Sequence, residues 1–426
     1  MGALASLAGR SNDRYRMMLI PTGKIRIGFL LLLGVATGRL SGQSEINLQK
    51  NDAAFNRLWL SMDSIEHNQN AELSILYLGG SHVQAGWIGH YMRGALMKWS
   101  PATEWTKGLM LPYRLAQTNT PTHFRTEMEG HWDGLTCAQS RWLIEAFNDM
   151  DIVGSGIQVQ TTSAEASIQH VSYLPDSTKF HSTAFDVWTN ADRDEVYWNG
   201  HEEVLQMREL ETGNGWRIQL AEPTDTFRLA FRTAPDRIGS ITYAGAYAHG
   251  LKTMPKLVFN EWGHNGLHIE DLERCTAFEH CLLRMQPDLI IMGIGLNDAI
   301  DQQGFNLREF STTYTQSIKE IKATLPDAAI LFLSNTNVHF ARQSTIQNSE
   351  EISAFLSTFA RKSGNGFFDL GVATGGNENT ETWMANGWTK TDGIHFSQSG
   401  YHQIAQIIFD AVLSSYHGAS LKPISD

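Results

Sequence analysis

Apolar residues in two separated parts of the chain form short strand patterns, and most of these are followed by a helical pattern. The first strand pattern, Leu73 to Leu78, ends in Gly79-Gly80-Ser81. The later strand patterns are Lys256 to Phe259, Leu289 to Met292, Ala329 to Leu333 and Gly366 to Leu370. Strands that alternate with helices predict a parallel sheet covered by helices, which is an α/β fold.

The helical patterns place apolar residues three and four positions apart. This spacing predicts one helix over Ser81 to Leu96 and a second over Ile269 to Met285. A third helix is expected over Leu307 to Ile321, after a loop with the sequence GIGLND. Ser397 is a typical N-cap residue for a closing helix that continues to Val412.

Between these two parts the periodicity changes to two residues, which is typical of antiparallel strands with one buried face. The alternating segments are Ile157 to Thr161, Ser167 to Tyr173, Ala184 to Thr189, Val204 to Leu210, Trp216 to Leu220 and Thr226 to Phe231. We therefore predict an antiparallel β-sandwich domain at residues 120–245. It is inserted between the two parts of an α/β domain, at residues 43–119 and 246–426.

A short apolar segment lies near the N-terminus. Ile27 to Ala36 reads IGFLLLLGVA, Lys24 and Arg26 precede it, and small or polar residues follow it. This pattern predicts a secretory signal peptide at residues 1–42 and export to the periplasm or the outside of the cell. The segment is about half the length that spans a bilayer, so a membrane anchor is the weaker interpretation, as is a buried helix. No integral membrane span is expected after cleavage.

The net charge of the chain limits the classes of binding partner that are expected. The chain of 426 residues has a formal net charge of -12, and residues 1–42 hold six basic side chains and one acidic one. The remainder therefore carries a charge of -17, which repels phosphate backbones and argues against nucleic-acid binding. Three cysteines are too few for a disulfide framework. The oligomeric state is left open.

Polar and glycine residues follow the predicted strands at the edge where ligands bind in open parallel sheets. Ser81 is a candidate nucleophile after the first strand. Gly266 and Asn297 follow the next two and are candidate donors for an oxyanion. Near the C-terminus, Asp392 and His395 lie three residues apart in TDGIHFSQSG, so that the carboxylate can orient the imidazole as a general base.

The four segments that carry Ser81, Gly266, Asn297 and the Asp392–His395 pair occur in this order in the SGNH (GDSL-type) hydrolases. The chain resembles that family over about residues 70–115 and 255–415. The resemblance implies a flavodoxin-like parallel sheet with helices on both faces. It also implies a triad of Ser81, Asp392 and His395, and an oxyanion hole made by Ser81, Gly266 and Asn297. One departure is Gly80, where the family usually has aspartate. The elbow motif GxSxG of α/β-hydrolases is absent, because Val83 occupies its second glycine position.

The 185 residues that separate Ser81 from Gly266 leave room for the whole inserted domain. This layout resembles the bacterial peptidoglycan O-acetylesterases, in which a carbohydrate-binding-like sandwich interrupts the catalytic domain. The resemblance implies an exported serine esterase that removes O-acetyl groups from a cell-wall polysaccharide and needs no cofactor. The alternatives are an acetyltransferase or an acetylxylan-type esterase on the same scaffold, and a non-catalytic glycan-binding protein.

Two other features have weaker functional interpretations. His264 and His268 are spaced as zinc ligands on a helix, but no third ligand follows at a recognisable spacing, so no metal site is predicted. The aromatic residues of the insert are Trp188, Tyr197, Trp198 and Trp216. They can stack on sugar rings, but aromatic residues on strands are more often part of the core.

Overall fold

The computed structural model describes residues 53–139, 154–251, 253–275, 277–300, 304–336 and 343–420. Six parallel strands form one sheet, in the order β17-β16-β15-β1-β14-β2. Their bounds are β1 Glu72–Gly79, β2 Glu104–Thr106, β14 Lys256–Gly263, β15 Leu289–Gly293, β16 Ala329–Leu333 and β17 Gly366–Phe368. The predicted parallel α/β sheet is therefore confirmed.

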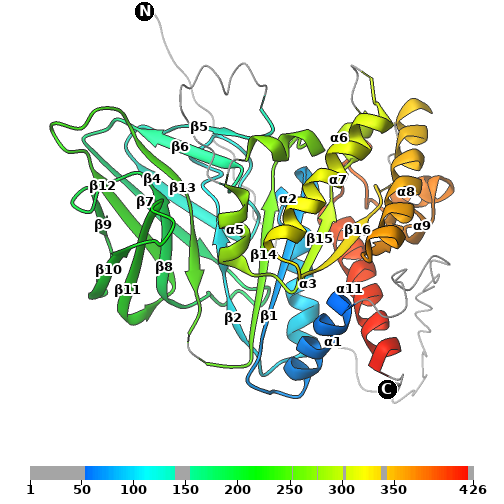
Figure 1. Cartoon of the computed structure of the whole chain (residues 1–426), viewed down its shortest axis with the longest axis horizontal. Coiled ribbons are helices and arrows are strands. Elements are labelled where there is room, and N and C mark those ends of the chain that lie inside the picture. The colour runs from blue at the N-terminus through cyan, green and yellow to red at the C-terminus, as the bar shows by residue number, and fades with distance from the viewer. Residues whose placement is uncertain are drawn as a thin grey trace, which may run out of the picture. The chain divides into compact units, whose positions relative to one another are not determined.

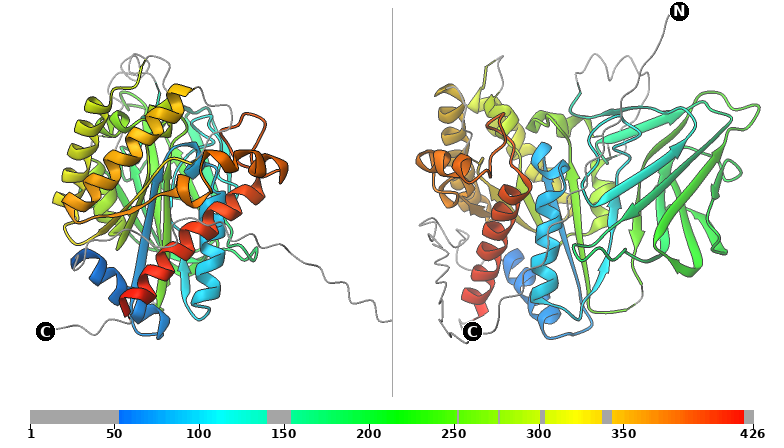
Figure 2. Two further views of the ribbon diagram at one scale, coloured as in Figure 1. Left: turned by 90° about the vertical axis from the view of Figure 1, so that its right-hand side faces the viewer. Right: turned by 180° about the vertical axis from the view of Figure 1, so that it is seen from behind.

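Side chains that alternate along β1 pack into two different cores, one on each face of the sheet. Leu73, Ile75 and Tyr77 pack with α1 (Ala53–Glu66), α3 (Trp87–Trp99) and α11 (Gln398–Ser420). Leu76 and Leu78 belong to the other core, with α5 (Phe278–Met285), α7 (Leu307–Thr324) and α8 (Gln343–Ser363). Helices thus cover both faces, as Figures 1 and 2 show.

The helix predictions were correct for α7 and α11 and wrong in three details. The helix expected from Ser81 is split into α2 (Ser81–Gln84) and α3, because Gly86 between them is left-handed with φ 74°. The helix expected over Ile269 to Met285 is a 3₁₀ helix, η1 (Ile269–Arg274), followed by α5, with Ala277 left-handed before it. The expected loop GIGLND turns into a helix at its end, α6 (Leu296–Ile300).

Two antiparallel sheets lie between β1 and β14 in the sequence and beside the parallel sheet in Figure 1. One has the order β10-β11-β8-β13-β6-β5, with β3 paired to β13, and the other has the order β4-β7-β12-β9. Their bounds are β3 Gly108–Met110, β4 Phe124–Glu129, β5 Asp133–Thr136, β6 Ile157–Thr161, β7 Glu165–Ser172, β8 Ser182–Thr189, β9 Val196–Trp198, β10 Val204–Glu209, β11 Gly215–Thr224, β12 Thr226–Arg232 and β13 Ile241–His249. This confirms the inserted antiparallel β structure.

The predicted domain limits remain predictions. The antiparallel strands run from β3 to β13 and so extend beyond residues 120–245 on both sides. The predicted signal peptide lies outside the described residues. Within the described ranges, no helix is both long and apolar enough to span a bilayer. Cys137, Cys275 and Cys281 are buried free thiols.

Candidate active site

Glycines end three neighbouring strands of the parallel sheet, because Gly79 pairs with both Gly263 and Gly293. A Cβ atom on Gly79 would lie 2.5 Å from Val83 Cγ2, and one on Gly263 would lie 2.4 Å from the backbone nitrogen of Gln84. Helix α2 therefore rests directly on the strand ends, in a space that only glycine leaves open. This contact places Ser81 at the carboxyl edge of the sheet.

Three side chains from distant parts of the sequence form a chain of hydrogen bonds at this edge. Ser81 Oγ lies 2.8 Å from His395 Nε2, and His395 Nδ1 lies 3.0 Å from Asp392 Oδ2. With Nδ1–H donating to the carboxylate, Nε2 presents its lone pair to the serine hydroxyl. This is the geometry that a nucleophile, its general base and an orienting acid require.

Asp392 is held in place by more than the imidazole. Its Oδ1 accepts hydrogen bonds from the backbone N–H groups of Ile394, at 2.9 Å, and His395, at 2.8 Å. Desolvation by partial burial raises the pKa of this carboxyl, but these hydrogen bonds and the imidazole outweigh it and hold the pKa below its usual range. Asp392 therefore stays ionised at neutral pH and keeps its orientation toward the ring.

A small cluster next to Ser81 consists of Asn297, Gly80 and Gly266. Asn297 Nδ2 donates one hydrogen bond to the carbonyl of Leu267, at 3.0 Å, and lies only 2.9 Å from where a Cβ on Gly80 would be. Gly266 has φ 81°, and an ideal Cβ on it would have no described atom within 4 Å. Within the described ranges the backbone N–H groups of Ser81 and Gly266 donate to no protein acceptor. Three donors are thus available for an oxyanion.

His82 and Tyr401 are two residues of this site that the sequence analysis did not identify. His82 Nδ1 lies 3.1 Å from the Tyr401 hydroxyl, and the His82 ring lies 5.5 Å from the His395 ring. Burial, with a smaller contribution from the neighbouring His395, lowers the pKa of His82 to about 3. His82 is therefore uncharged at neutral pH, and its ring packs beside the imidazole of His395. No sequence motif marks this pair.

Two further polar side chains hold the turn that carries Gly266. Gln84 Oε1 accepts a hydrogen bond from the backbone N–H of Asn265 at 2.6 Å, which ties the turn to α2. Asp298 Oδ1 accepts from the backbone N–H of Ile269 at 3.1 Å, which ties the turn to α6. Burial raises the pKa of Asp298 to about 6. These contacts fix the distance between the proposed oxyanion donors and Ser81.

The two histidines considered as zinc ligands have different partners in the structure. His264 is buried, its Nε2 lies 3.0 Å from the carbonyl of Ser155, and its ring packs edge-on against Trp262. His268 caps η1 instead. Across the described ranges no group of three or more potential ligands is arranged to hold a metal ion.

The aromatic residues of the insert fall into two groups. Trp188 is buried, Trp198 stacks on Phe185, and the Trp216 indole donates to the carbonyl of Ala191, so these three belong to or border the insert's core. Tyr197 is exposed. The interpretation of these aromatic residues as core is thus correct except at Tyr197.

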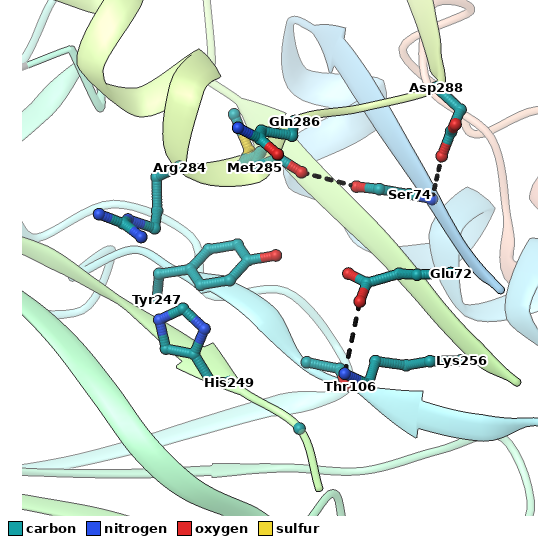
Figure 3. Close-up of a pocket in the computed structure, with 11 residues that line it drawn as sticks. Glu72, Ser74, Thr106, Tyr247, His249, Lys256, Arg284, Met285, Gln286 and Asp288 are labelled. Carbon is teal, nitrogen blue, oxygen red and sulfur yellow. Dashed lines mark hydrogen bonds and ion pairs between the residues drawn. The ribbon is translucent and has the colours of Figure 1, made fainter. Parts of the chain in front are cut away.

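A cavity of about 360 Å³ lies at the opposite edge of the parallel sheet (Figure 3). Its walls include Glu72 and Ser74 at the start of β1, Asp288 just before β15, and Arg284 from α5. Because β1 is eight residues long, roughly 25 Å separates this edge from Ser81. The cavity is lined by two acidic side chains (Glu72 and Asp288), by Lys256, Arg284 and His249, and by none of the candidate catalytic residues.

Comparison with known proteins supports the same family. Residues 238–403 match the GDSL-like Lipase/Acylhydrolase family. No curated protein matches the sequence. A solved structure of a peptidoglycan O-acetylesterase is similar over 88% of this chain and 99% of that chain, with a TM-score of 0.69 and 18% identity. The similarity shows that the two share a fold.

Two smaller solved structures overlap with part of the chain. A lipase/acylhydrolase from Enterococcus faecalis, 18% identical, covers 40% of this chain and 81% of its own, with a TM-score of 0.29. A carbohydrate esterase family 3 protein from Talaromyces cellulolyticus, 16% identical, covers 40% of this chain and 77% of its own, with a TM-score of 0.30.

The prediction of an SGNH-type ester hydrolase is confirmed by the family match.

Proposed function

We propose that the protein is an exported esterase that removes O-acetyl groups from peptidoglycan, and the match of residues 238–403 to the GDSL-like lipase/acylhydrolase family supports the esterase part of this proposal. The observation that carries the proposal is the hydrogen-bonded chain from Ser81 through His395 to Asp392. The family match begins at residue 238, near the end of the insert, and does not include Ser81, so the assignment of Ser81 as the nucleophile rests on the folded geometry.

In the first half of the reaction, Ser81 Oγ attacks the acetyl carbonyl carbon while its proton passes to His395 Nε2. The carboxylate of Asp392 stabilises the imidazolium that forms. The negative charge on the carbonyl oxygen is met by the N–H groups of Ser81 and Gly266 and by the amide of Asn297. When the intermediate collapses, His395 returns the proton to the departing sugar oxygen, and the acetyl group remains on Ser81.

Water completes the reaction. His395 Nε2 accepts a proton from the water as its oxygen attacks the acetyl-serine, and then returns it to Ser81 Oγ as acetate leaves. Every proton in this sequence is carried by groups of the chain itself, so the mechanism needs no cofactor. If a sugar hydroxyl replaces the water, the same intermediate gives acetyl transfer.

The choice of peptidoglycan is supported by the fold that the chain shares with a peptidoglycan O-acetylesterase along most of its length. Acetate release should be measured from O-acetylated peptidoglycan, acetylated xylan and a long-chain ester side by side, with Ser81→Ala as the control. We expect fastest release from peptidoglycan. Preference for xylan would assign a plant-polysaccharide substrate, and preference for the long chain would overturn the carbohydrate assignment.

Export has a separate test. The leader that the sequence predicts should be removed near Gly42, so the protein isolated from its native host should begin near Gln43. N-terminal mass spectrometry gives the answer directly. An intact leader on cytoplasmic protein would contradict export and would place the enzyme away from the cell wall.

A further inference from the structure

A second cavity, of about 520 Å³, lies between the parallel α/β part and the antiparallel insert. Trp87 and His90 of α3 and Gln398 of α11 line one side. Arg125 of β4 and Tyr173, which follows β7, line the other. Figure 2 (right) shows α3 between α11 and the antiparallel strands.

This cavity is next to the segments that carry the candidate triad. Trp87 begins α3, six residues after Ser81, and Gln398 begins α11, three residues after His395. The backbone N–H of Thr122, another lining residue, donates to the carbonyl of Ala85 just after α2. A polymer whose acetyl group lies at Ser81 can therefore extend into this cavity.

The charge of the cavity is opposite to that of the body of the protein. Two arginines, Arg114 and Arg125, line it, and the described lining includes no acidic side chain, whereas the chain after residue 42 carries -17. Both arginines are exposed, and neither has an acceptor for its guanidinium among the described residues. Asp176 is in an adjacent loop, but its carboxylate accepts hydrogen bonds from Thr178.

The nearest buried acid does not cancel these charges. Glu261 lies below the cavity, where its Oε2 is 2.8 Å from the Arg93 guanidinium and 3.2 Å from His123 Nε2. Arg93 neutralises this carboxylate. Burial lowers the pKa of both His90 and His123, so that these two lining imidazoles are neutral at pH 7. The net charge of the cavity comes from Arg114 and Arg125.

Neutral polar and aromatic groups complete the lining. His123 is 3% exposed, and its Nδ1, like that of His90, has no hydrogen-bond partner among the described residues. Trp87 is half-buried, stacks on Tyr91 and lines the cavity. Aromatic faces pack against the apolar faces of sugar rings, and guanidinium groups bind carboxylates through paired hydrogen bonds.

We propose that this cavity is a subsite for a carboxylate group of the polymer that lies on or next to the sugar unit whose acetyl ester is cleaved at Ser81. The inference rests on the proposed function and specifies its substrate class as an acidic glycan. The carboxylate has two possible sources. It belongs either to the sugar ring itself, as in a hexuronate, or to a lactyl or peptide group attached to an amino sugar.

The test uses the variant Arg114→Gln/Arg125→Gln, with Arg208→Gln on β10 as the matched control. Turnover is measured on O-acetylated peptidoglycan, acetylated polygalacturonate, neutral acetylated xylan and p-nitrophenyl acetate. We expect kcat/KM on the preferred acidic polymer to fall about 10- to 100-fold, mainly through KM, as the loss of charge-assisted hydrogen bonds predicts. Rates on the two neutral substrates should not change. The acidic polymer that responds identifies the source of the carboxylate.

A binding experiment separates this inference from the proposed function. Ser81→Ala protein, with and without the two arginine substitutions, is sedimented with de-O-acetylated peptidoglycan and titrated with polygalacturonate. We expect binding that weakens with salt and is lost in the arginine variant. Binding that is equal in both proteins, or absent from both, would overturn the subsite. If binding depends on the arginines but no acetate is released by active enzyme, the proposed function fails and the subsite stands.

Discussion

Gly80 and Asn297 fit against each other so closely that a Cβ on Gly80 would lie 2.9 Å from Asn297 Nδ2. A side chain at position 80 would therefore require the Asn297 amide to shift from its place beside Ser81. In the sequence, Gly80 stands out only as a departure from the aspartate that is usual in the SGNH hydrolases. In this chain the glycine belongs to the geometry of the proposed oxyanion hole.

We predict that Gly80→Ala displaces the Asn297 amide and lowers kcat toward the level of Asn297→Ala. Loss of one oxyanion donor costs roughly 10²- to 10³-fold in turnover. Gly418→Ala on α11 is the matched control, because no described atom lies within 4 Å of the added Cβ. Aryl-acetate kinetics of the three variants give the comparison. Wild-type turnover in Gly80→Ala would show that Asn297 does not act through this contact.

Asp392→Asn should reduce kcat by on the order of 10⁴ while the protein still folds. An asparagine oxygen can still accept the two backbone hydrogen bonds that Asp392 Oδ1 receives, but its NH₂ group faces His395 Nδ1 and favours the wrong tautomer. The control is Asp410→Asn on α11, where the exposed carboxylate contacts only Gln406 among the described residues. An Asp392→Asn enzyme with full turnover would mean that another group orients the imidazole.

His82 is predicted to position His395 without carrying a proton. Because burial lowers its pKa to about 3, His82 does not titrate in the range where a histidine general base works. His82→Phe and Tyr401→Phe each remove the hydrogen bond between them and should lower kcat about 5- to 10-fold, the value of one neutral hydrogen bond. The pH dependence of kcat should keep its shape in both variants. A lost or shifted limb in His82→Phe alone would identify His82 as a proton carrier.

Asp298 makes the stability of the fold depend on pH. Burial raises its pKa in the folded protein to about 6, above the value of about 3.9 for an exposed aspartate. The folded state therefore binds more protons than the unfolded state between these two values. The free energy of unfolding should fall as pH rises through this window, by up to about 3 kcal/mol, and remain lower above pH 6.

Asp298→Asn should remove this loss, because the amide oxygen still accepts from Ile269 and no charge is buried. Urea unfolding of both proteins at pH 4.5 and pH 7.5 measures the effect. The variant should be the more stable protein at the higher pH and gain little at the lower one. A variant that is less stable than the wild type at pH 7.5 would show that the ionised carboxylate is stabilised by its surroundings.

The pattern of apolar residues predicted most strands of the parallel sheet, because buried parallel strands are short apolar runs that stand out from their surroundings. Strands β2 and β3, of three residues each, are too short to show a period and were not predicted. The strand expected to reach Leu370 ends at Phe368, because the Asp369 side chain caps the next helix, α9 (Leu370–Ala373). The capping hydrogen bond of Asp369 therefore ends the strand, although the apolar pattern continues to Leu370.

The candidate catalytic residues could be chosen from the sequence because each one follows a predicted strand or precedes a predicted helix. The residues that support them could not. His82, Gln84 and Asp298 act through contacts with Tyr401, Asn265 and Ile269, and the residues of each pair are at least 29 positions apart in the sequence. Such contacts depend on how distant segments pack together, so they cannot be predicted from the spacing of residues that are close in the sequence.

In the proposed mechanism Ser81 carries the acetyl group during turnover. The direct measurement is to mix the enzyme with an aryl acetate, quench it with acid within the first turnovers, digest it and locate any acetyl group by mass spectrometry. We expect acetylation of the peptide that contains Ser81, none in Ser81→Ala, and accumulation in Asp392→Asn if deacylation slows more than acylation. Acetylation of a different residue in an active enzyme, or steady turnover by Ser81→Ala, would contradict this mechanism.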